Sequence, residues 1–403
     1  MYKSIVKYVS IATLIVCGSV QAEAGTSGAS LERWRTYEGV SWERASDSNS
    51  PSRYAQSVTA PIAGLHFSKD GTAYVSTPRL LSPSAPATIS ILDLNATAGP
   101  ARLTAFPSVD VNAVDGDVKT SLRNVLGFHV DHRNNWLWAL DMGFIAGESE
   151  APAGAQKLIV FNLKSGTLVK SFPLDSVADR RGSFLNDVAV DEVRQVAYIS
   201  DSGFRSAPEN MSGIIVVNFK TSEVRRVLHQ HQSVQIKRDA KVYSHGEEVW
   251  PNKPLQVAIN GIALSPDAET LYWTVTAGDQ LHAMSTAVLR NFKSTDNQVA
   301  SSVRNLGTID GNTDGIVVDP SGRVFITNVT HNGISVFNPK RKRSTLLASD
   351  ERIYWPDTIT SGPQNALYFT ASNLNNHFAG AVKAGEERYE IWRLPARDRS
   401  LRK

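Results

Sequence analysis

The sequence predicts an all-β protein that forms one six-bladed β-propeller with four-stranded blades. Six segments repeat one pattern, in which two alternating apolar runs flank a polar turn. Successive copies start roughly 40 to 75 residues apart, which leaves room for a small sheet in each repeat. Long helical patterns are almost absent. Sheets that cannot bury both faces alone are expected to stack radially, each covering its neighbour. A pair of two-sheet sandwiches, the alternative, would not explain six copies of one pattern.

Composition and charge fit a globular protein and argue against a nucleic-acid partner. The chain has 403 residues, of which 41% are hydrophobic and 20% are charged, enough to build a sizeable core. The formal net charge is only +3, and the compact basic run is PKRKR at Pro339 to Arg343. Binding of phosphates needs a concentrated basic face. We therefore expect no nucleic acid, and we expect PKRKR to lie at a solvated hairpin tip.

The first 24 residues resemble a secretory signal peptide. Lys3 and Lys7 precede the apolar stretch YVSIATLIVCGSV, and small-x-small cleavage patterns follow it. A membrane anchor is the alternative, but the run is short for a span. Cys17, the one cysteine, lies inside this segment, and the bulky Val16 before it disfavours lipid attachment. We expect a bacterial secreted or periplasmic protein with no membrane attachment, and with no thiol after cleavage.

Residues 25–60 form a polar, turn-rich lead-in before the propeller at 61–396, and a basic tail occupies 397–403. The lead-in is expected to donate one strand and to help close the ring. The turns SKDG, SPDAE, DPSGR and SGPQN separate the paired runs and support hairpins. The six predicted hairpins are Ile62–Thr77, Leu126–Asp141, Leu185–Asp201, Ile259–Val275, Thr313–Asn328 and Pro356–Ala371.

Several repeats continue with a second pair of strands. These further pairs are predicted at Lys157–Phe172, Gly213–Leu228 and Gly333–Ala348. A short helical pattern is present at Ser285–Phe292. Together with the hairpins, these segments give about four strands per repeat.

One position, which we call the slot, recurs at the head of the first strand of every repeat. In a propeller this strand lines the central axis, so these six side chains should point into one shared space. They are Ala63, Leu126, Asn186, Asn260, Asp314 and Asp357. Asn and Asp also favour turns, but turn chemistry does not readily explain four polar residues in consecutive repeats. Oxygen ligands of this kind suit a hard divalent cation such as Ca²⁺ or Mg²⁺, or a small molecule that forms hydrogen bonds.

Several motifs resemble the major royal jelly protein/Yellow family, in its bacterial branch. They include FLNDVAVDEVRQVAYISDSG, NGIALSPDAETLYW, LHAMSTAVLRN, TDGIVVDPSGRVFITNVTHNGISVFNP, YWPDT and STPRLLSPSAPATIS, and the match runs from Arg53 onward. The resemblance implies a secreted six-bladed propeller. It implies mixed functions, since some insect members are implicated in melanin-pathway chemistry on dopachrome, some bind biogenic amines and others are nutrient proteins. The sequence departs from the eukaryotic pattern in lacking cysteines for disulfides.

A more distant resemblance is to the gluconolactonase/regucalcin propellers, whose axial metal is held by a Glu, two Asn and an Asp. That resemblance would make Asn186, Asn260 and Asp314 ligands of Ca²⁺ or another divalent cation. The Glu is expected at the head of the first blade, where this chain has Ala63. Glu38, in YEGVSW, is a weak substitute because no similar strand follows it.

Other residues have both structural and functional interpretations. His129 follows Leu126 by three positions, so strand alternation would place it on the opposite face, as a hydrogen-bonded histidine. It is kept as a candidate ligand-binding residue. Asp141 and Asp201, which end second strands, are expected to reach backbone amides of a neighbouring blade or a ligand. Tryptophans 138, 273 and 355 are expected to pack between blades.

Two classes of function remain open from the sequence. In the first, the protein binds a small amine, phenol or sugar-like ligand at the mouth of the channel, through the four polar slot residues and His129. In the second, it is a metal-dependent lactonase or isomerase, with a cation at the axial cluster polarising a carbonyl. The missing fourth metal ligand favours the binding protein.

Overall fold

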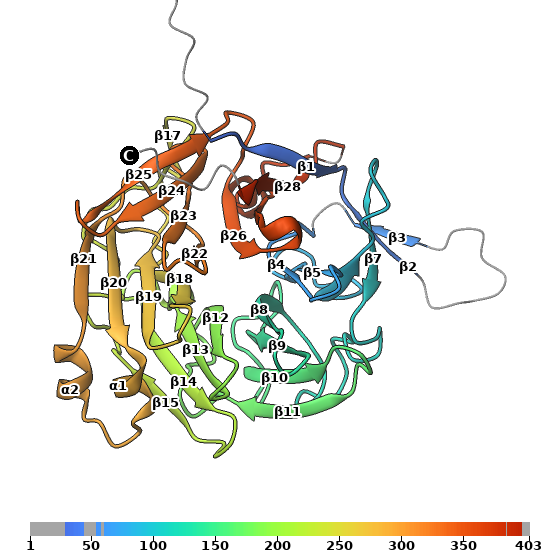
Figure 1. Ribbon diagram of the computed structural model, residues 1–403. Coiled ribbons are helices and arrows are strands. Elements are labelled where there is room, and N and C mark those ends of the chain that lie inside the picture. The colour runs from blue at the N-terminus through green and yellow to red at the C-terminus, as the bar shows by residue number, and fades with distance from the viewer. Residues whose placement is uncertain (1–28, 44–53, 58–59, 384, 397–403) are drawn as a thin grey trace, which may run out of the picture.

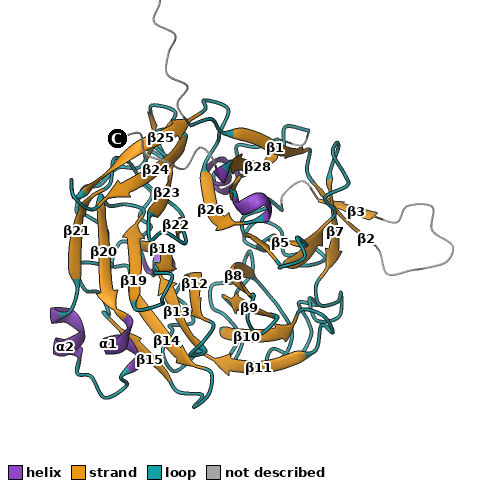
Figure 2. Ribbon diagram, viewed as in Figure 1, coloured by secondary structure: helices purple, strands orange, loops and turns teal. Residues whose placement is uncertain are grey.

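A computed structural model describes residues 29–43, 54–57, 60–383 and 385–396 of the chain. Its strands form six blades arranged radially around a central axis, and the strands of blades 4 and 5 are joined in one eight-stranded sheet (Figure 1). Almost all of the regular structure is β, with three short helices at the periphery and on one face (Figure 2). The predicted fold class, an all-β six-bladed propeller, is confirmed.

Each blade is an antiparallel meander whose first strand lies innermost. Blade 1 has β4 (Leu65–Phe67), β5 (Ala73–Ser76), β6 (Ile89–Leu92) and β7 (Ala101–Ala105). Blade 2 has β8 (Val125–Asp131), β9 (Trp136–Asp141), β10 (Lys157–Asn162) and β11 (Leu168–Pro173). Blade 3 has β12 (Leu185–Asp191), β13 (Val196–Asp201), β14 (Gly213–Asn218) and β15 (Val224–Val227).

The second half of the ring repeats this order. Blade 4 has β18 (Ile259–Leu264), β19 (Thr270–Val275), β20 (Gln280–Ser285) and β21 (Arg304–Thr308). Blade 5 has β22 (Ile316–Val318), β23 (Val324–Asn328), β24 (Gly333–Asn338) and β25 (Arg343–Ser349). Blade 6 has β26 (Pro356–Ser361), β27 (Leu367–Ala371) and β28 (Tyr389–Leu394), and a strand from the lead-in completes it.

That strand is β1 (Glu32–Tyr37), which pairs antiparallel with β28 and so joins the two ends of the chain. The next strand, β2 (Val40–Glu43), runs parallel to β7 at the outer edge of blade 1, and β3 (Tyr54–Ser57) pairs with β2. The lead-in therefore supplies strands to the last blade and the first blade, and it closes the ring between them (Figure 1).

Segments outside the meanders lie in the connections. Helices α1 (Thr286–Arg290) and α2 (Asp296–Ser301) link β20 to β21, and α1 coincides with the predicted helical pattern. A hairpin of β16 (Tyr243–Ser244) and β17 (Glu247–Glu248) lies in the long connection from blade 3 to blade 4. Helix α3 (Leu374–Phe378) follows β27 in blade 6. The PKRKR run forms the exposed turn between β24 and β25, as predicted.

The hydrophobic core consists of layers between neighbouring blades. One cluster joins blades 2 and 3 around Trp138, and another joins blades 3 and 4 around Trp273; both indole rings are fully buried. The cluster between blades 6 and 1 includes Tyr37 from β1 and Tyr389 from β28. Because each blade buries its two faces against its neighbours, the six blades depend on one another for a core.

Candidate functional site

The innermost strands carry an irregularity at the predicted slot. Strands β8, β12, β18 and β26 each show a shift of register there, and in β12 it falls between Leu185 and Asp187. A β-bulge places an extra residue in one strand and re-aims the nearby side chains. In β12 and β26 two successive side chains line the channel, Asn186 with Asp187 and Asp357 with Thr358.

The spacing of the strands around the axis is fixed by hydroxyl groups on second strands. Ser76 donates to the carbonyl oxygen of Leu126 in the next blade at 2.7 Å. Ser200 donates to the carbonyl oxygen of Asn260 at 2.7 Å, and Thr370 donates to that of Ala63 at 2.7 Å. Three blades thus hold the backbone at the strand head of the following blade.

Five of the six predicted slot residues line the central channel: Leu126, Asn186, Asn260, Asp314 and Asp357. We call these five the axial ring. They border two chambers, one on either side of them along the axis. The sixth residue, Ala63, is fully buried and packs beside Leu126 and Trp355 without lining either chamber.

Within the ring, Asn260 and Asp314 contact each other directly. The Asn260 side-chain amide donates to Asp314 Oδ1, and it also donates to Thr276 Oγ1 at 2.9 Å. The Trp355 indole N–H donates to Asp314 Oδ2 at 2.5 Å. Both Asp314 oxygens therefore have a protein donor, and no described residue donates a hydrogen bond to the Asn260 side-chain oxygen.

The other two polar members of the ring have unused hydrogen-bonding groups. Asn186 is 8% exposed, and its side-chain amide has no hydrogen-bond partner among the described residues. The Asp357 carboxylate likewise receives no hydrogen bond from the described part of the chain. Buried polar groups in proteins are normally paired, so these two groups are available to a ligand or to water.

One chamber is lined mainly by aromatic and aliphatic side chains, and we call it the aromatic chamber. Its volume is about 70 Å³. Around the axial ring it is bordered by Phe184, Phe204, Trp250, Trp355 and Phe378, together with leucines 80, 81, 255 and 374. Trp250 comes from the long connection between blades 3 and 4, and its indole N–H donates to the Asn375 carbonyl oxygen at 3.2 Å. This contact joins that connection to helix α3 over the chamber.

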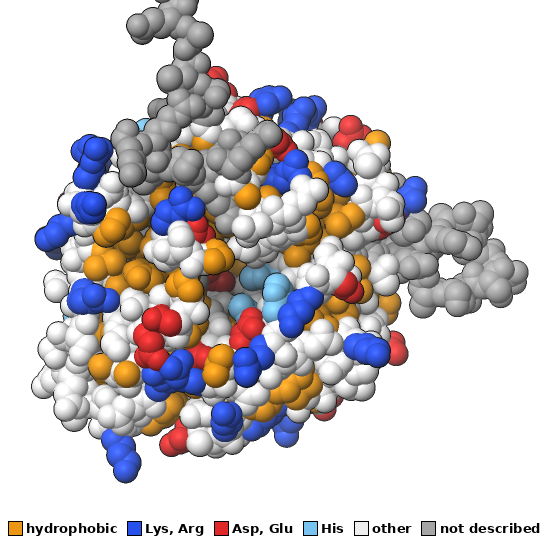
Figure 3. Space-filling view, in the orientation of Figure 1, with side chains coloured by type: hydrophobic (Ala, Val, Ile, Leu, Met, Phe, Trp, Pro, Cys, Tyr) orange, Lys and Arg blue, Asp and Glu red, His pale blue; other side chains and the backbone are white. Residues whose placement is uncertain are grey.

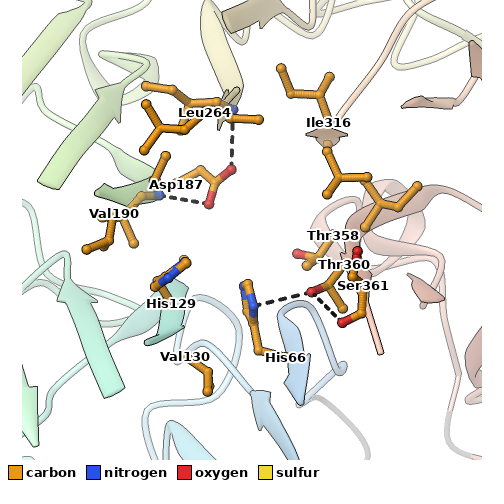
Figure 4. Close-up of a pocket in the computed structure, with 18 of the residues that line it drawn as sticks. His66, His129, Val130, Asp187, Val190, Leu264, Ile316, Thr358, Thr360 and Ser361 are labelled. Atoms are coloured by element: carbon orange, nitrogen blue, oxygen red, sulfur yellow. Dashed lines mark hydrogen bonds between the residues drawn. The ribbon is translucent and has the colours of Figure 1, made fainter. Parts of the chain in front are cut away.

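The second chamber, the histidine chamber, opens on the face seen in Figure 3, where histidine side chains lie in a central hollow. Its volume is about 270 Å³. His66 and His129 lie next to each other on its wall, Asp187 lies beside Leu264, and Ile316 lies across from His129 (Figure 4). Asp187 accepts backbone N–H groups from Val188 at 2.8 Å and from Ile262 at 3.4 Å.

Three carboxyl groups gather at the axis, and each has a raised pKa. Burial raises the pKa of Asp314 to about 6, against the hydrogen bonds from Trp355 and Asn260. Burial also raises the pKa of Asp187 to about 6. The pKa of Asp357 lies well above its usual range because of burial, to which the charges of Asp314 and Asp187 add. The raised values mean that burial, and for Asp357 also the neighbouring carboxyl groups, disfavour the ionised form of these acids.

His129 is a channel residue, and it is also hydrogen-bonded. Its Nε2 lies 3.1 Å from Glu192 Oε1, and Glu192 also accepts the backbone N–H of Arg133 at 2.9 Å. Burial acts to raise the pKa of Glu192, but the hydrogen bond and charge of His129 and the backbone N–H groups lower it to about 2. The expectation that His129 faces away from Leu126 is wrong, because the bulge in β8 interrupts the alternation between them.

The structure corrects the expectation for Trp355 and agrees with the weak case for Glu38. Trp355 does not simply pack between blades, since its indole binds Asp314 and lines the aromatic chamber. Glu38 is exposed in the turn between β1 and β2 at the outer edge of the ring, so it supplies no axial ligand.

Asp141 and Asp201 bind backbone amides of their own blades rather than of neighbours. Asp201 accepts the N–H groups of Phe184 at 2.9 Å and Gly203 at 3.0 Å. It thereby anchors the segment that leads into Asn186. Asp141 does the same for Asn124 at 3.0 Å, ahead of Leu126.

The sequence reasoning missed several channel residues. Asp187 and Thr358 directly follow slot residues, and His66 lies three residues after one. The Asn-Asp pair at 186–187 could have indicated that Asp187 reaches the channel, since both residues lie at the start of the same innermost strand. Trp250 had no such signal, because it reaches the channel through a long connection outside the repeats.

The predicted metal ligands are Asn186, Asn260 and Asp314. Among the described residues, no group of three or more His, Cys, Asp or Glu side chains is placed to hold a metal ion. Both Asp314 oxygens already accept hydrogen bonds, and Ca²⁺ prefers six to eight oxygen ligands. A site that uses Asn side chains would not be counted among such groups, so the binding of a divalent cation by Asn186, Asn260 and Asp314 stays a prediction.

Comparison with known proteins identifies one family and several structures of similar fold. The family model described as major royal jelly protein matches residues 124–402, more than half of the chain. No curated protein matches the sequence.

Among solved structures, a gluconolactonase from Xanthomonas campestris is similar at 15% identity, with 83% of this chain and 86% of that chain covered and a TM-score of 0.47. A luciferin-regenerating enzyme is similar at 10% identity, with 84% and 92% covered and a TM-score of 0.49. These are likenesses of fold alone.

Proposed function

Because this chain belongs to the major royal jelly protein family, we propose that it is a secreted or periplasmic protein that binds a small organic amine in the aromatic chamber. The signal-peptide prediction supports the location, although residues 1–24 lie outside the described residues. No helix in the described part of the chain is both long and apolar enough to cross a membrane.

The observation that carries the proposal is the pair of polar groups without protein partners at the axial ring. Asn186 and Asp357 border a chamber with mainly apolar walls, and neither side chain is hydrogen-bonded by the described chain. Small-molecule sites typically combine apolar walls with a few convergent polar groups. An ammonium group could donate to the Asp357 carboxylate and to the oxygens of Asn186 and Asn260.

The charge of the site favours an amine over the other two ligand classes. The carboxyl groups of Asp357, Asp314 and Asp187 raise one another's pKa or are raised by burial, so a cation would relieve their repulsion. A phenol or a sugar brings no positive charge. The rings of Trp355 and Phe184 suit the apolar body of an amine, and an aromatic face attracts a cation.

The proposal is tested by calorimetric titration of the mature protein with phenethylammonium, with phenol, glucose and Ca²⁺ as separate titrants. We expect phenethylammonium to bind, and to raise the melting temperature by mass action. The Asp357→Asn variant should weaken binding at least about tenfold, because loss of one partner of a buried charge pair typically costs about 2–5 kcal/mol. The matched control is Asp110→Asn, which removes an exposed carboxylate far from the channel.

Three outcomes count against this function. One is the absence of heat and of thermal shift with phenethylammonium. The second is equal affinity in the parent and Asp357→Asn. The third is a Ca²⁺ response that Asp314→Ala abolishes while the amine has no effect, which would support the predicted metal ligands instead.

A further inference from the structure

The histidine chamber is a second space that the proposed function does not use. It is larger than the aromatic chamber, at about 270 Å³ against about 70 Å³. It opens on the face shown in Figure 3. Asp187 and His66 line this chamber but not the aromatic one, so the two spaces can be tested separately.

The chamber combines polar groups with aliphatic walls. Figure 4 shows His66 beside Thr360, and Asp187 beside Leu264, with Ile316 across the space from His129. The aliphatic residues from blades 4 and 5 begin at Asp187, which accepts the backbone N–H of Ile262, and they are Ile262, Leu264, Ile316, Val317 and Val318. A ligand that fills this space needs a polar end and a hydrocarbon flank.

The charge inside the chamber is negative. Asp187 and the ring residues Asp314 and Asp357 face it, and no Lys or Arg occurs among the described residues that line it. At its rim, Glu192 is paired with His129. Burial and the neighbouring imidazoles lower the pKa of His66 to about 3, so this side chain carries no compensating charge near neutral pH.

An unpaired buried amide also faces this space. Asn186 is 8% exposed, lines the chamber and has no hydrogen-bond partner among the described residues. Its neighbour Asp187 accepts only the two backbone N–H groups of Val188 and Ile262, and a carboxylate has room for more donors. The two side chains offer oxygen acceptors at one end of a space with an aliphatic wall.

We propose that the histidine chamber binds a linear alkylammonium ion, with its ammonium group at Asp187 and Asn186 and its hydrocarbon chain along Ile262, Leu264 and Ile316. A straight chain fits because the wall is aliphatic. The imidazoles are hydrogen-bonded to other side chains, His129 Nε2 to Glu192 and His66 Nδ1 to Thr360 Oγ1 at 3.4 Å.

The test is calorimetric titration of the mature protein with methyl-, ethyl-, propyl- and butylammonium. Burial of each methylene should raise affinity by up to about fourfold. Asp187→Asn should lower butylammonium affinity at least about tenfold. The control Asp110→Asn should leave the affinity unchanged.

A second variant addresses the aliphatic wall without touching a charge. Leu264 is half-buried, so Leu264→Ser should fold, and it should flatten the gain in affinity along the alkyl series. Circular dichroism melts of each variant identify any loss of fold.

The same variants separate this proposal from the proposed function. If phenethylammonium binds in the aromatic chamber, Asp187→Asn should lower its affinity by clearly less than the tenfold loss expected for butylammonium, because Asp187 acts on that chamber only through its charge and does not line it. Phe378→Ser, at the exposed rim of the aromatic chamber, should weaken phenethylammonium and leave butylammonium unchanged. The second site would be overturned if butylammonium failed to bind. It would also be overturned if Phe378→Ser abolished butylammonium binding while Asp187→Asn left that binding unchanged. Neither result would count against binding of phenethylammonium in the aromatic chamber.

Discussion

The axial carboxyl groups are unfavourable in the folded protein unless something neutralises them. Asp314 and Asp187 have pKa values of about 6, raised from an ordinary value of 3.8. Between about pH 4 and 6 the folded chain therefore binds more protons than the unfolded chain. The contribution of these groups to stability rises as the pH falls through this range, and at neutral pH they oppose folding. Such a cost is typical of a site arranged for a ligand rather than for stability.

This argument predicts how amine binding depends on pH. The ammonium ion needs ionised carboxylates, and phenethylammonium stays protonated below a pKa close to that of lysine, about 10. Affinity should be greatest above pH 7 and should fall by about tenfold between pH 7 and pH 5, as the axial acids gain protons. Titrations at pH 5, 6, 7 and 8 check this result. Affinity that is constant or that rises on acidification would show that the axial acids do not hold the ligand.

At the scale of the element, the innermost strands share a feature beyond the slot residue. In four blades the next residue is glycine, at positions 64, 127, 261 and 315. A Cβ on Gly127 would lie 2.3 Å from the carbonyl oxygen of Asn186, and one on Gly315 would lie 2.5 Å from that of Asp357. The strand heads approach so closely that most blades exclude a side chain here. Asp187 and Thr358 occupy this position in the other two blades, and both line the histidine chamber.

We therefore expect Gly127→Ala to disturb the channel more than its small volume suggests. The new methyl group would meet backbone of the next blade, which cannot turn aside as a side chain can, and overpacking typically costs about 1–3 kcal/mol. Denaturant melts should show this loss, and phenethylammonium should bind more weakly. The matched control is Thr358→Gly, which removes a side chain at the same position in blade 6 and should keep the fold. Equal stability of Gly127→Ala and the parent would mean that the strand heads are not held tightly.

The elements were easier to predict from the sequence than the details of the site. All six hairpins and the three further strand pairs follow from alternation and turn residues, which act locally. The axial ring followed from aligning the repeats. The orientation of His129 and the position of Asp187 in the lining of the histidine chamber depend on bulges, which leave the local sequence pattern almost unchanged. Trp250 and its contact with Asn375 depend on a long-range encounter over the channel.

For the whole molecule, the channel exists only because the ring is closed. The axial ring takes its members from blades 2 to 6, and each blade is covered by two neighbours. The seam between blades 6 and 1 is held by β1, since it is the outermost strand of blade 6 and continues into β2 on blade 1. Stability of the seam should therefore be coupled to the geometry of the binding site at the axis.

Tyr37 gives a direct test of that coupling. It lies at the end of β1, is fully buried, pairs with Tyr389 and belongs to the hydrophobic cluster between blades 6 and 1. Truncation of a large buried side chain typically costs about 3–5 kcal/mol. We expect Tyr37→Ala to lower the melting temperature in calorimetry while the protein still unfolds in one transition, because no blade has a core of its own. Phenethylammonium affinity should fall as well, although the residue does not line either chamber.

Two control variants accompany this test. Tyr37→Phe keeps the ring and should bind phenethylammonium as the parent does. Arg33→Ala, on the more exposed part of the same strand, should change stability by less than about 1 kcal/mol. Separate melting of the blades, or full amine affinity in a destabilised Tyr37→Ala, would show that the channel does not depend on the seam.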